Sequence, residues 1–145
     1  MTHEDAGHYA AKHPAGTQAD PALCRTIEKK SRRQRISCVA AHAVARDFAV
    51  SPATVGRAID LMEHRLEKCQ MGLFGYTPER RIVTPAVSVS PELSEAIEKN
   101  SVDDRITCLA CWQIAERLEL PRMAVSSACE ALQLKIITCQ LGAFK

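Results

Sequence analysis

The chain has 145 residues, of which 46% are hydrophobic and 25% are charged, and its formal net charge is +2. These are ordinary values for a globular protein, and no run of about 20 apolar residues is present that would form a membrane-spanning helix. No apolar stretch follows the N-terminus, so we expect no signal peptide, no membrane partner and a cytoplasmic location. Seven cysteines, an odd number, indicate free thiols rather than a disulfide framework.

Residues 1–20 are small and polar and have no apolar period. Such a composition at a chain end predicts a mobile arm. The arm carries His3, His8 and His13, and imidazole is a common metal ligand. Because their spacing places them on no common helical face, we expect all three side chains to be exposed to solvent.

The rest of the chain is an internal repeat. Residues 21–74 align with residues 91–144 at a constant offset of 70, without a gap, and 17 of the 54 aligned positions are identical. A fixed period of this length indicates a duplicated structural unit. Because units of about 55 residues are marginally stable alone, we expect the two to pack together. The chain divides into the arm (1–20), a basic repeat (21–83), a linker (84–90) and an acidic repeat (91–145).

Each repeat begins with a signal for the start of a helix. Asp20-Pro21 and Ser90-Pro91 place a capping side chain before a proline at the first helical position. We expect a short strand next, then a second helix, a tight turn and a third helix that starts near Pro52 or Arg122. The predicted strands are 35–37 and 105–107, and the predicted second helices are 38–48 and 108–118.

Each repeat ends in an extended segment. Residues 134–144, with adjacent Ile136 and Ile137, are typical of a strand. In the basic repeat the corresponding segment continues through GYTPER into RIVTP. Two extended stretches around a turn with Gly and Pro predict a β-hairpin, or wing. We expect the acidic repeat, which stops at Lys145, to lack the return strand.

This order of elements resembles that of winged helix-turn-helix proteins. The stretch CVAAHAVARDFAVSPATVGRAIDLM carries the resemblance: a small residue where two helices cross (Ala45), a short turn (Ala49-Val50), a capping Ser51 and a buried Val55. The matching positions of the acidic repeat are Ala115, Leu120 and Val125. The resemblance implies a mainly α fold with short β-hairpins, built as two winged-helix-like units of three helices.

The resemblance also implies binding of double-stranded DNA, with a third helix entering the major groove. Residues 21–74 carry ten Lys and Arg and five Asp and Glu, a net of +5, whereas residues 91–145 carry six and eight, a net of −2. We therefore expect DNA to bind the basic repeat, although a solvated basic face is the alternative. The outward positions of its third helix are Ala53, Thr54, Arg57 and Asp60. The candidate contacts are Ser51, Thr54, Arg57, Lys29, Lys30, Arg32, Arg33 and Arg35.

The acidic repeat replaces the basic run with Asn100, Val102, Asp103 and Asp104, which suits DNA poorly. We expect it to bind a protein partner or the other repeat instead. Helix-turn-helix units also dock proteins, so the alternative to a DNA-binding transcription regulator is a non-enzymatic interaction adaptor. No nucleophile–base pair, phosphate-binding loop or carboxylate pair is evident, so we expect neither enzymatic activity nor a cofactor.

Four cysteines also recur, as Cys38, Cys69, Cys108 and Cys139. Pairing of the short strand with the terminal strand would bring Cys38 close to Cys69 and Cys108 close to Cys139. Four thiolates would suit zinc or an iron–sulfur cluster in a metal- or redox-responsive regulator, but the wide spacing favours packing. We expect Cys24, Cys111 and Cys129 to fill the core. Gln70 and Gln140 follow a repeated cysteine, and each is predicted to bond backbone, with a ligand contact as the alternative.

Overall fold

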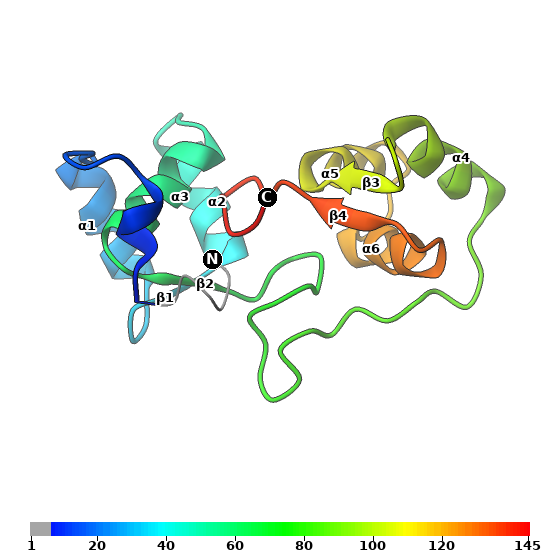
Figure 1. Ribbon diagram of the computed structural model, residues 1–145, viewed down its shortest axis with the longest axis horizontal. Coiled ribbons are helices and arrows are strands. Elements are labelled where there is room, and N and C mark those ends of the chain that lie inside the picture. The colour runs from blue at the N-terminus through cyan, green and yellow to red at the C-terminus, as the bar shows by residue number, and fades with distance from the viewer. Residues whose placement is uncertain (1–6) are drawn as a thin grey trace. The chain divides into compact units, whose positions relative to one another are not determined.

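The computed structural model describes residues 7–145, so His3 lies outside the described residues, and the elements recur at the offset of the sequence repeat (Figure 1). The first repeat contains α1 (Pro21–Lys30), β1 (Arg35–Ser37), α2 (Cys38–Asp47), α3 (Pro52–Leu61) and β2 (Arg65–Glu67), after a 3-10 helix, η2 (Tyr9–Lys12). The second contains α4 (Pro91–Asn100), β3 (Arg105–Thr107), α5 (Cys108–Arg117), α6 (Arg122–Ala131) and β4 (Lys135–Ile137). The expected class, mainly α with short strands, is confirmed.

Local caps explain where the helices begin. Asp20, Ser37, Ser51, Ser90 and Thr107 each accept a hydrogen bond from a backbone N–H two or three residues further on. These bonds satisfy N–H groups that have no partner within the helix, as their sequence positions predicted. Pro121, at the start of α6, supplies no side-chain cap.

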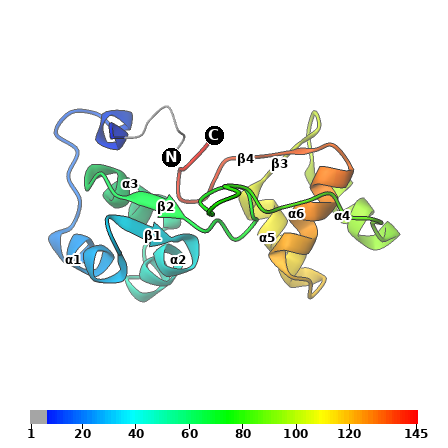
Figure 2. The same cartoon turned by 90° about the horizontal axis from the view of Figure 1, so that it is seen from below.

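The strands form two parallel pairs. β1 pairs with β2 in the register Ile36 to Leu66, and β3 pairs with β4 in the register Ile106 to Ile136 (Figure 2). The pairing of the short strand with the terminal strand, considered above only as a condition for bringing the repeated cysteines together, is present in both repeats. The hairpin expected after β2 is reduced to one isolated antiparallel bridge, between Tyr76 and Arg80.

Each set of three helices encloses a small aliphatic core. In the first repeat α1 and α2 both contact α3, and Ile27, Val55 and Ile59 are fully buried. The central residues of the strand pairs close the core on the side of the sheet, because Ile36 and Leu66 are also buried. The corresponding core side chains of the second repeat are Ile97, Ile106, Val125, Cys129 and Ile136.

The limits of the compact units differ from those of the repeats. Unit 1 consists of the described residues up to Cys69 together with Gln140–Phe144, and unit 2 consists of Gln70–Cys139 with Lys145. The repeats therefore exchange the segments that follow their second strands. We call residues 70–74 and 140–144 the exchanged segments, and they are the two copies of the sequence Q-x-G-x-F.

In unit 1 the exchanged segment 140–144 crosses the middle of α3. Leu141 and Ala143 are buried there. The backbone comes so close that a Cβ atom on Gly56 would stand 1.8 Å from the Leu141 carbonyl oxygen. Real Cβ atoms never approach so closely, so this crossing requires glycine at position 56.

In unit 2 the exchanged segment 70–74 crosses α6 at the corresponding place. The buried Ser126, which takes the position of Gly56, donates a hydrogen bond from Oγ to the Met71 carbonyl at 2.7 Å. The Gly72 carbonyl accepts two more, from the N–H groups of Ile82 at 2.9 Å and Val83 at 3.1 Å. Segment 70–74 is thus held on one side by the backbone of Ile82 and Val83 and on the other side by α6.

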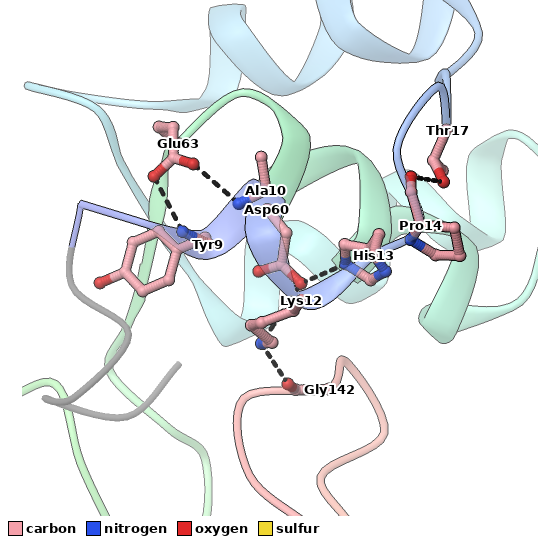
Figure 3. A network of polar contacts seen from close by, with 9 residues as sticks. All are labelled: Tyr9, Ala10, Lys12, His13, Pro14, Thr17, Asp60, Glu63 and Gly142. Carbon is pink, nitrogen blue, oxygen red and sulfur yellow. Dashed lines mark hydrogen bonds and ion pairs between the residues drawn. The ribbon is translucent and has the colours of Figure 1, made fainter.

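Residues 9–13, which were expected to belong to a mobile arm, instead pack on the C-terminal half of α3 (Figure 3). The Glu63 carboxylate accepts hydrogen bonds from the N–H groups of Tyr9 at 3.0 Å and Ala10 at 2.7 Å. Lys12 Nζ donates to the Gly142 carbonyl at 2.9 Å, so this segment also contacts the exchanged segment. Composition missed this role because the partners are distant in sequence.

Residues 81–86, at the end of the basic repeat and the start of the linker, serve unit 2 in the same way. Arg81 forms an ion pair with Glu130 of α6, and the Ala86 N–H donates to the Ser127 carbonyl at 3.0 Å. Residues 81–86 stand at the same distance before α4 as residues 11–16 stand before α1. The structural repeat therefore includes residues that precede the part of the sequence in which the two copies are similar.

The buried Tyr9 provides a test of the packing on α3. Its side chain is only 3% exposed, so Tyr9→Ala is expected to lower the free energy of unfolding by about 3 kcal/mol. Urea denaturation followed by circular dichroism measures this change. His8→Ala is the matched control, because the neighbouring His8 is exposed. A Tyr9→Ala chain as stable as the control would mean that the segment does not pack.

Candidate nucleic-acid interface

Six exposed cations gather at one end of unit 1. Lys29 and Lys30 lie in the last turn of α1, Arg32 and Arg33 lie in the turn that follows, and Arg35 begins β1. The parallel register places Arg35 beside Arg65, the first residue of β2, which the sequence prediction missed. The basic cluster is therefore Lys29, Lys30, Arg32, Arg33, Arg35 and Arg65.

A tight turn presents the tip of the basic cluster. Arg32 and Arg35 exchange two backbone hydrogen bonds, at 2.8 Å and 2.9 Å, around Arg33 and Gln34. Both central residues have a left-handed backbone, with φ of 52° and 63°. The Gln34 carbonyl accepts a bond from the Arg65 N–H at 2.8 Å, which ties the turn to β2. The three arginines beside the turn are thus held on one hydrogen-bonded scaffold.

No carboxylate neutralises the basic cluster in the described part of the chain, since none of its six side chains forms an ion pair there. The nearest acid in sequence, Glu28, is bonded to the buried His64, with Oε2 at 2.6 Å from Nε2. The other ring nitrogen, Nδ1, lies 3.0 Å from the Met62 carbonyl. Both ring nitrogens of His64 thus have a partner, and Glu28 is occupied by this contact.

The predicted contacts on α3 form a separate group. Ser51, Thr54 and Arg57 lie on the N-terminal half of the helix, and Ser51 Oγ caps it by accepting the Thr54 N–H at 3.1 Å. The helix of ten residues is about 15 Å long, and its C-terminal end leads to Arg65. Ser51 and Thr54 thus lie at the opposite end of α3 from Arg65.

Asp60, which was expected on the outward face of α3, is 1% exposed. Its Oδ2 lies 2.8 Å from His13 Nε2 and 3.3 Å from Lys12 Nζ, so His13 is also bonded rather than freely exposed (Figure 3). Together with the crossing segment 140–144, these contacts cover one side of α3. The strip of α3 left to solvent runs through Ala53 and Arg57.

Unit 2 has the same scaffold with different charges. Its turn is closed by the same pair of backbone hydrogen bonds, between Val102 and Arg105. Asp103 and Asp104 occupy the left-handed positions, with φ of 51° and 60°. Arg105 still pairs in register with Lys135, and Lys99 matches Lys29, so three cations remain where unit 1 has six, and Lys99 forms an ion pair with Glu95.

The repeated glutamines differ from their prediction in one respect. Gln70 Oε1 accepts a hydrogen bond from the Arg122 guanidinium on α6, a side-chain partner that was not predicted. The same guanidinium lies 3.5 Å over the centre of the Trp112 ring, a cation–π contact. Gln70 thus joins the exchanged segment to both α5 and α6.

The repeated cysteines are packing residues in the described structure. Cys38, Cys69 and Cys108 are buried and Cys139 is half-buried, and all seven cysteines are free thiols. Between residues 7 and 145, no group of three or more His, Cys, Asp or Glu side chains is arranged to hold a metal ion.

A second pair of cysteines was not predicted. Cys111 of α5 and Cys129 of α6 are fully buried and their side chains form a hydrogen bond. This bond and burial together raise the pKa of Cys111, so its thiol stays protonated. Unit 1 has Ala41 and Ile59 at these positions, so one small and one large side chain are replaced by two of intermediate size.

Comparison with known proteins gives no match: no family model fits the chain, and neither a curated protein nor a solved structure is similar to it. Within the described residues, no helix has the length and apolar character required to cross a membrane.

Burial of the thiols predicts a distinct pattern of alkylation. Cys24 and Cys139 are half-buried and should react with iodoacetamide first, whereas the five buried cysteines should react only when their unit opens. Peptide mass spectrometry against time measures the order. Raising the pH to 9 should not make Cys111 reactive, because its pKa is raised. Early modification of Cys111 or Cys129 would contradict the packing described for unit 2.

Proposed function

We propose that the protein is a cytoplasmic, non-enzymatic regulator that binds double-stranded DNA through unit 1. The observation that carries this proposal is the basic cluster, in which six exposed cations lie on one scaffold without an acidic partner. Such a surface attracts a nucleic acid, because binding of the cations to the phosphates releases the counterions that are condensed on the nucleic acid. Unit 2 provides an internal comparison, because the same backbone there carries few cations.

The residue types found in the turn support a binding role for their side chains. A left-handed backbone is tolerated by Asp, as at Asp103 and Asp104, but it costs about 1 kcal/mol at a residue such as Arg33. Unit 1 therefore carries arginine where local stability favours another residue. Binding of phosphate by the exposed guanidinium explains this choice, because Arg makes paired hydrogen bonds to phosphate oxygens.

The strand register allows a test with matched variants. Replacing Arg35 and Arg65 by Ala removes two cations from unit 1, and replacing Arg105 and Lys135 removes two from the same positions of unit 2. Fluorescence anisotropy with a mixed-sequence duplex across a range of salt concentrations measures the affinity. The slope of log K against log salt should become shallower by about 2 for the first variant, at about 0.9 per phosphate contact, and should not change for the second.

An equal loss in both double variants would show that the overall charge, and not unit 1, governs binding. If the unaltered chain fails to bind duplex DNA at low salt, the DNA proposal is wrong. The fold would then be better explained as a protein-docking adaptor.

Arg57 tests whether α3 contacts base edges. Its guanidinium lies on the exposed strip of α3, where a bidentate contact with guanine would contribute about 1–3 kcal/mol. Arg57→Ala is expected to reduce the preference among sequences in a selected duplex library while the salt slope changes by no more than about 1. Sequencing of the bound fraction measures the preference. If the preference among DNA sequences does not change, Arg57 contacts no base edge and the contacts of unit 1 are with phosphates.

For unit 2 we propose a protein partner. Val102, which replaces Arg32, is 73% exposed at the tip of the acidic turn. It borders a shallow depression beside β3 that is also lined by Asn100, Thr107 and Ile137. An exposed apolar side chain among carboxylates suits a basic protein surface better than DNA.

A further inference from the structure

Unit 2 contains a pair of adjacent buried thiols that unit 1 lacks. Cys111 of α5 and Cys129 of α6 are each 0% exposed, and their side chains share a hydrogen bond. The bond places the two sulfur atoms side by side, on two helices that pack against each other. The two residues are far apart in the sequence, so only the packing of α6 on α5 brings them together.

Packing alone does not require thiols at these two positions. Unit 1 has Ala41 and Ile59 there, both fully buried, on helices that occupy the same places in the repeat. An aliphatic pair thus fills the corresponding site without any polar atom. Two adjacent thiols differ from that pair in their chemistry, because they can be oxidised to a disulfide.

We propose that Cys111 and Cys129 form an oxidation site, at which a hydroperoxide converts the two thiols to a disulfide that joins α5 to α6. The Cys129 sulfur attacks one peroxide oxygen and the O–O bond breaks. Cys129 becomes a sulfenic acid, and its proton leaves with the other oxygen as an alcohol, or as water from hydrogen peroxide. The Cys111 sulfur then attacks the sulfenic sulfur, so that the S–S bond forms, the S–O bond breaks and hydroxide leaves with the Cys111 proton as water.

The hydrogen bond sets the order of these two steps. Donation from the Cys111 thiol lowers the pKa of Cys129 against the opposing effect of burial, and the same bond raises the pKa of Cys111. The thiolate is the nucleophile towards peroxide, so Cys129 reacts first and Cys111 closes the disulfide. The competing thiol is the buried Cys108, which lies one turn before Cys111 on α5.

Burial sets the conditions under which the pair reacts. Because neither sulfur is exposed, the peroxide reaches Cys129 only when unit 2 opens locally. Closure of the unit then returns Cys111 to the side of the sulfenic acid. The pair is therefore expected to be oxidised more slowly than the half-buried Cys24 of unit 1, and faster in a low concentration of urea that increases local opening.

Peptide mapping of the full-length protein tests the proposal. The chain is treated with hydrogen peroxide under native conditions, unreacted thiols are alkylated in denaturant, and the protein is digested without reductant. We expect two peptides joined through Cys111 and Cys129, and we expect dithiothreitol to separate them. A link from Cys111 to Cys108 instead would overturn the proposal. So would recovery of Cys111 and Cys129 as alkylated thiols or sulfinic acids once Cys24 is completely oxidised.

The double variant Cys111→Ala/Cys129→Ile is the matched control, because it gives unit 2 the residue pair of unit 1. Trp112, the one tryptophan of the chain, lies on α5, so its fluorescence reports the unfolding of unit 2. Peroxide should raise the urea midpoint of the wild-type chain by about 1 M, since the disulfide constrains the unfolded chain, and should not change that of the control. An equal shift in both chains would assign the effect to other thiols and contradict the proposal. The peptide map of the wild-type chain decides the matter even if the control fails to fold.

Discussion

The approach of the Leu141 carbonyl to the Cα of Gly56 is the contact on which unit 1 depends. Glycine in the middle of a helix is less favourable than alanine by about 1 kcal/mol, and α3 accepts this cost because any side chain would displace the crossing backbone. Unit 2 solves the same problem differently, since Ser126 keeps a Cβ and donates a hydrogen bond to the Met71 carbonyl. In both units a backbone carbonyl of the other repeat is fitted to the middle of a helix.

This exchange accounts for the repeated C-Q-x-G-x-F motif. The position after Gln is buried in both copies, as Met71 and Leu141, and the glycine has a left-handed backbone at Gly72 and Gly142. A change in either copy would weaken the unit formed by the other repeat. The two copies keep the motif even though their surfaces have diverged, and mutual packing accounts for the buried position and the glycine.

Local signals predicted the elements well, and long-range contacts could not be predicted. Helix starts follow from residues such as Ser51 and Thr107, whose caps involve only near neighbours. The packing of Tyr9 on α3 and the burial of Asp60 depend on partners about 50 residues away, for which a single sequence gives no signal. Arg65 was missed at the candidate site for the same reason, because only the strand register brings it beside Arg35.

The turns before β1 and β3 have the same backbone conformation in both repeats but carry different side chains. Both turns have the same hydrogen bonds and the same left-handed positions, so the backbone alone does not dictate the side chains. Aspartate suits these positions and is present in unit 2, whereas unit 1 has Arg33 at a conformational cost. The exposed charge of the basic cluster, and not the helical scaffold common to both units, is therefore the feature that distinguishes unit 1 from unit 2.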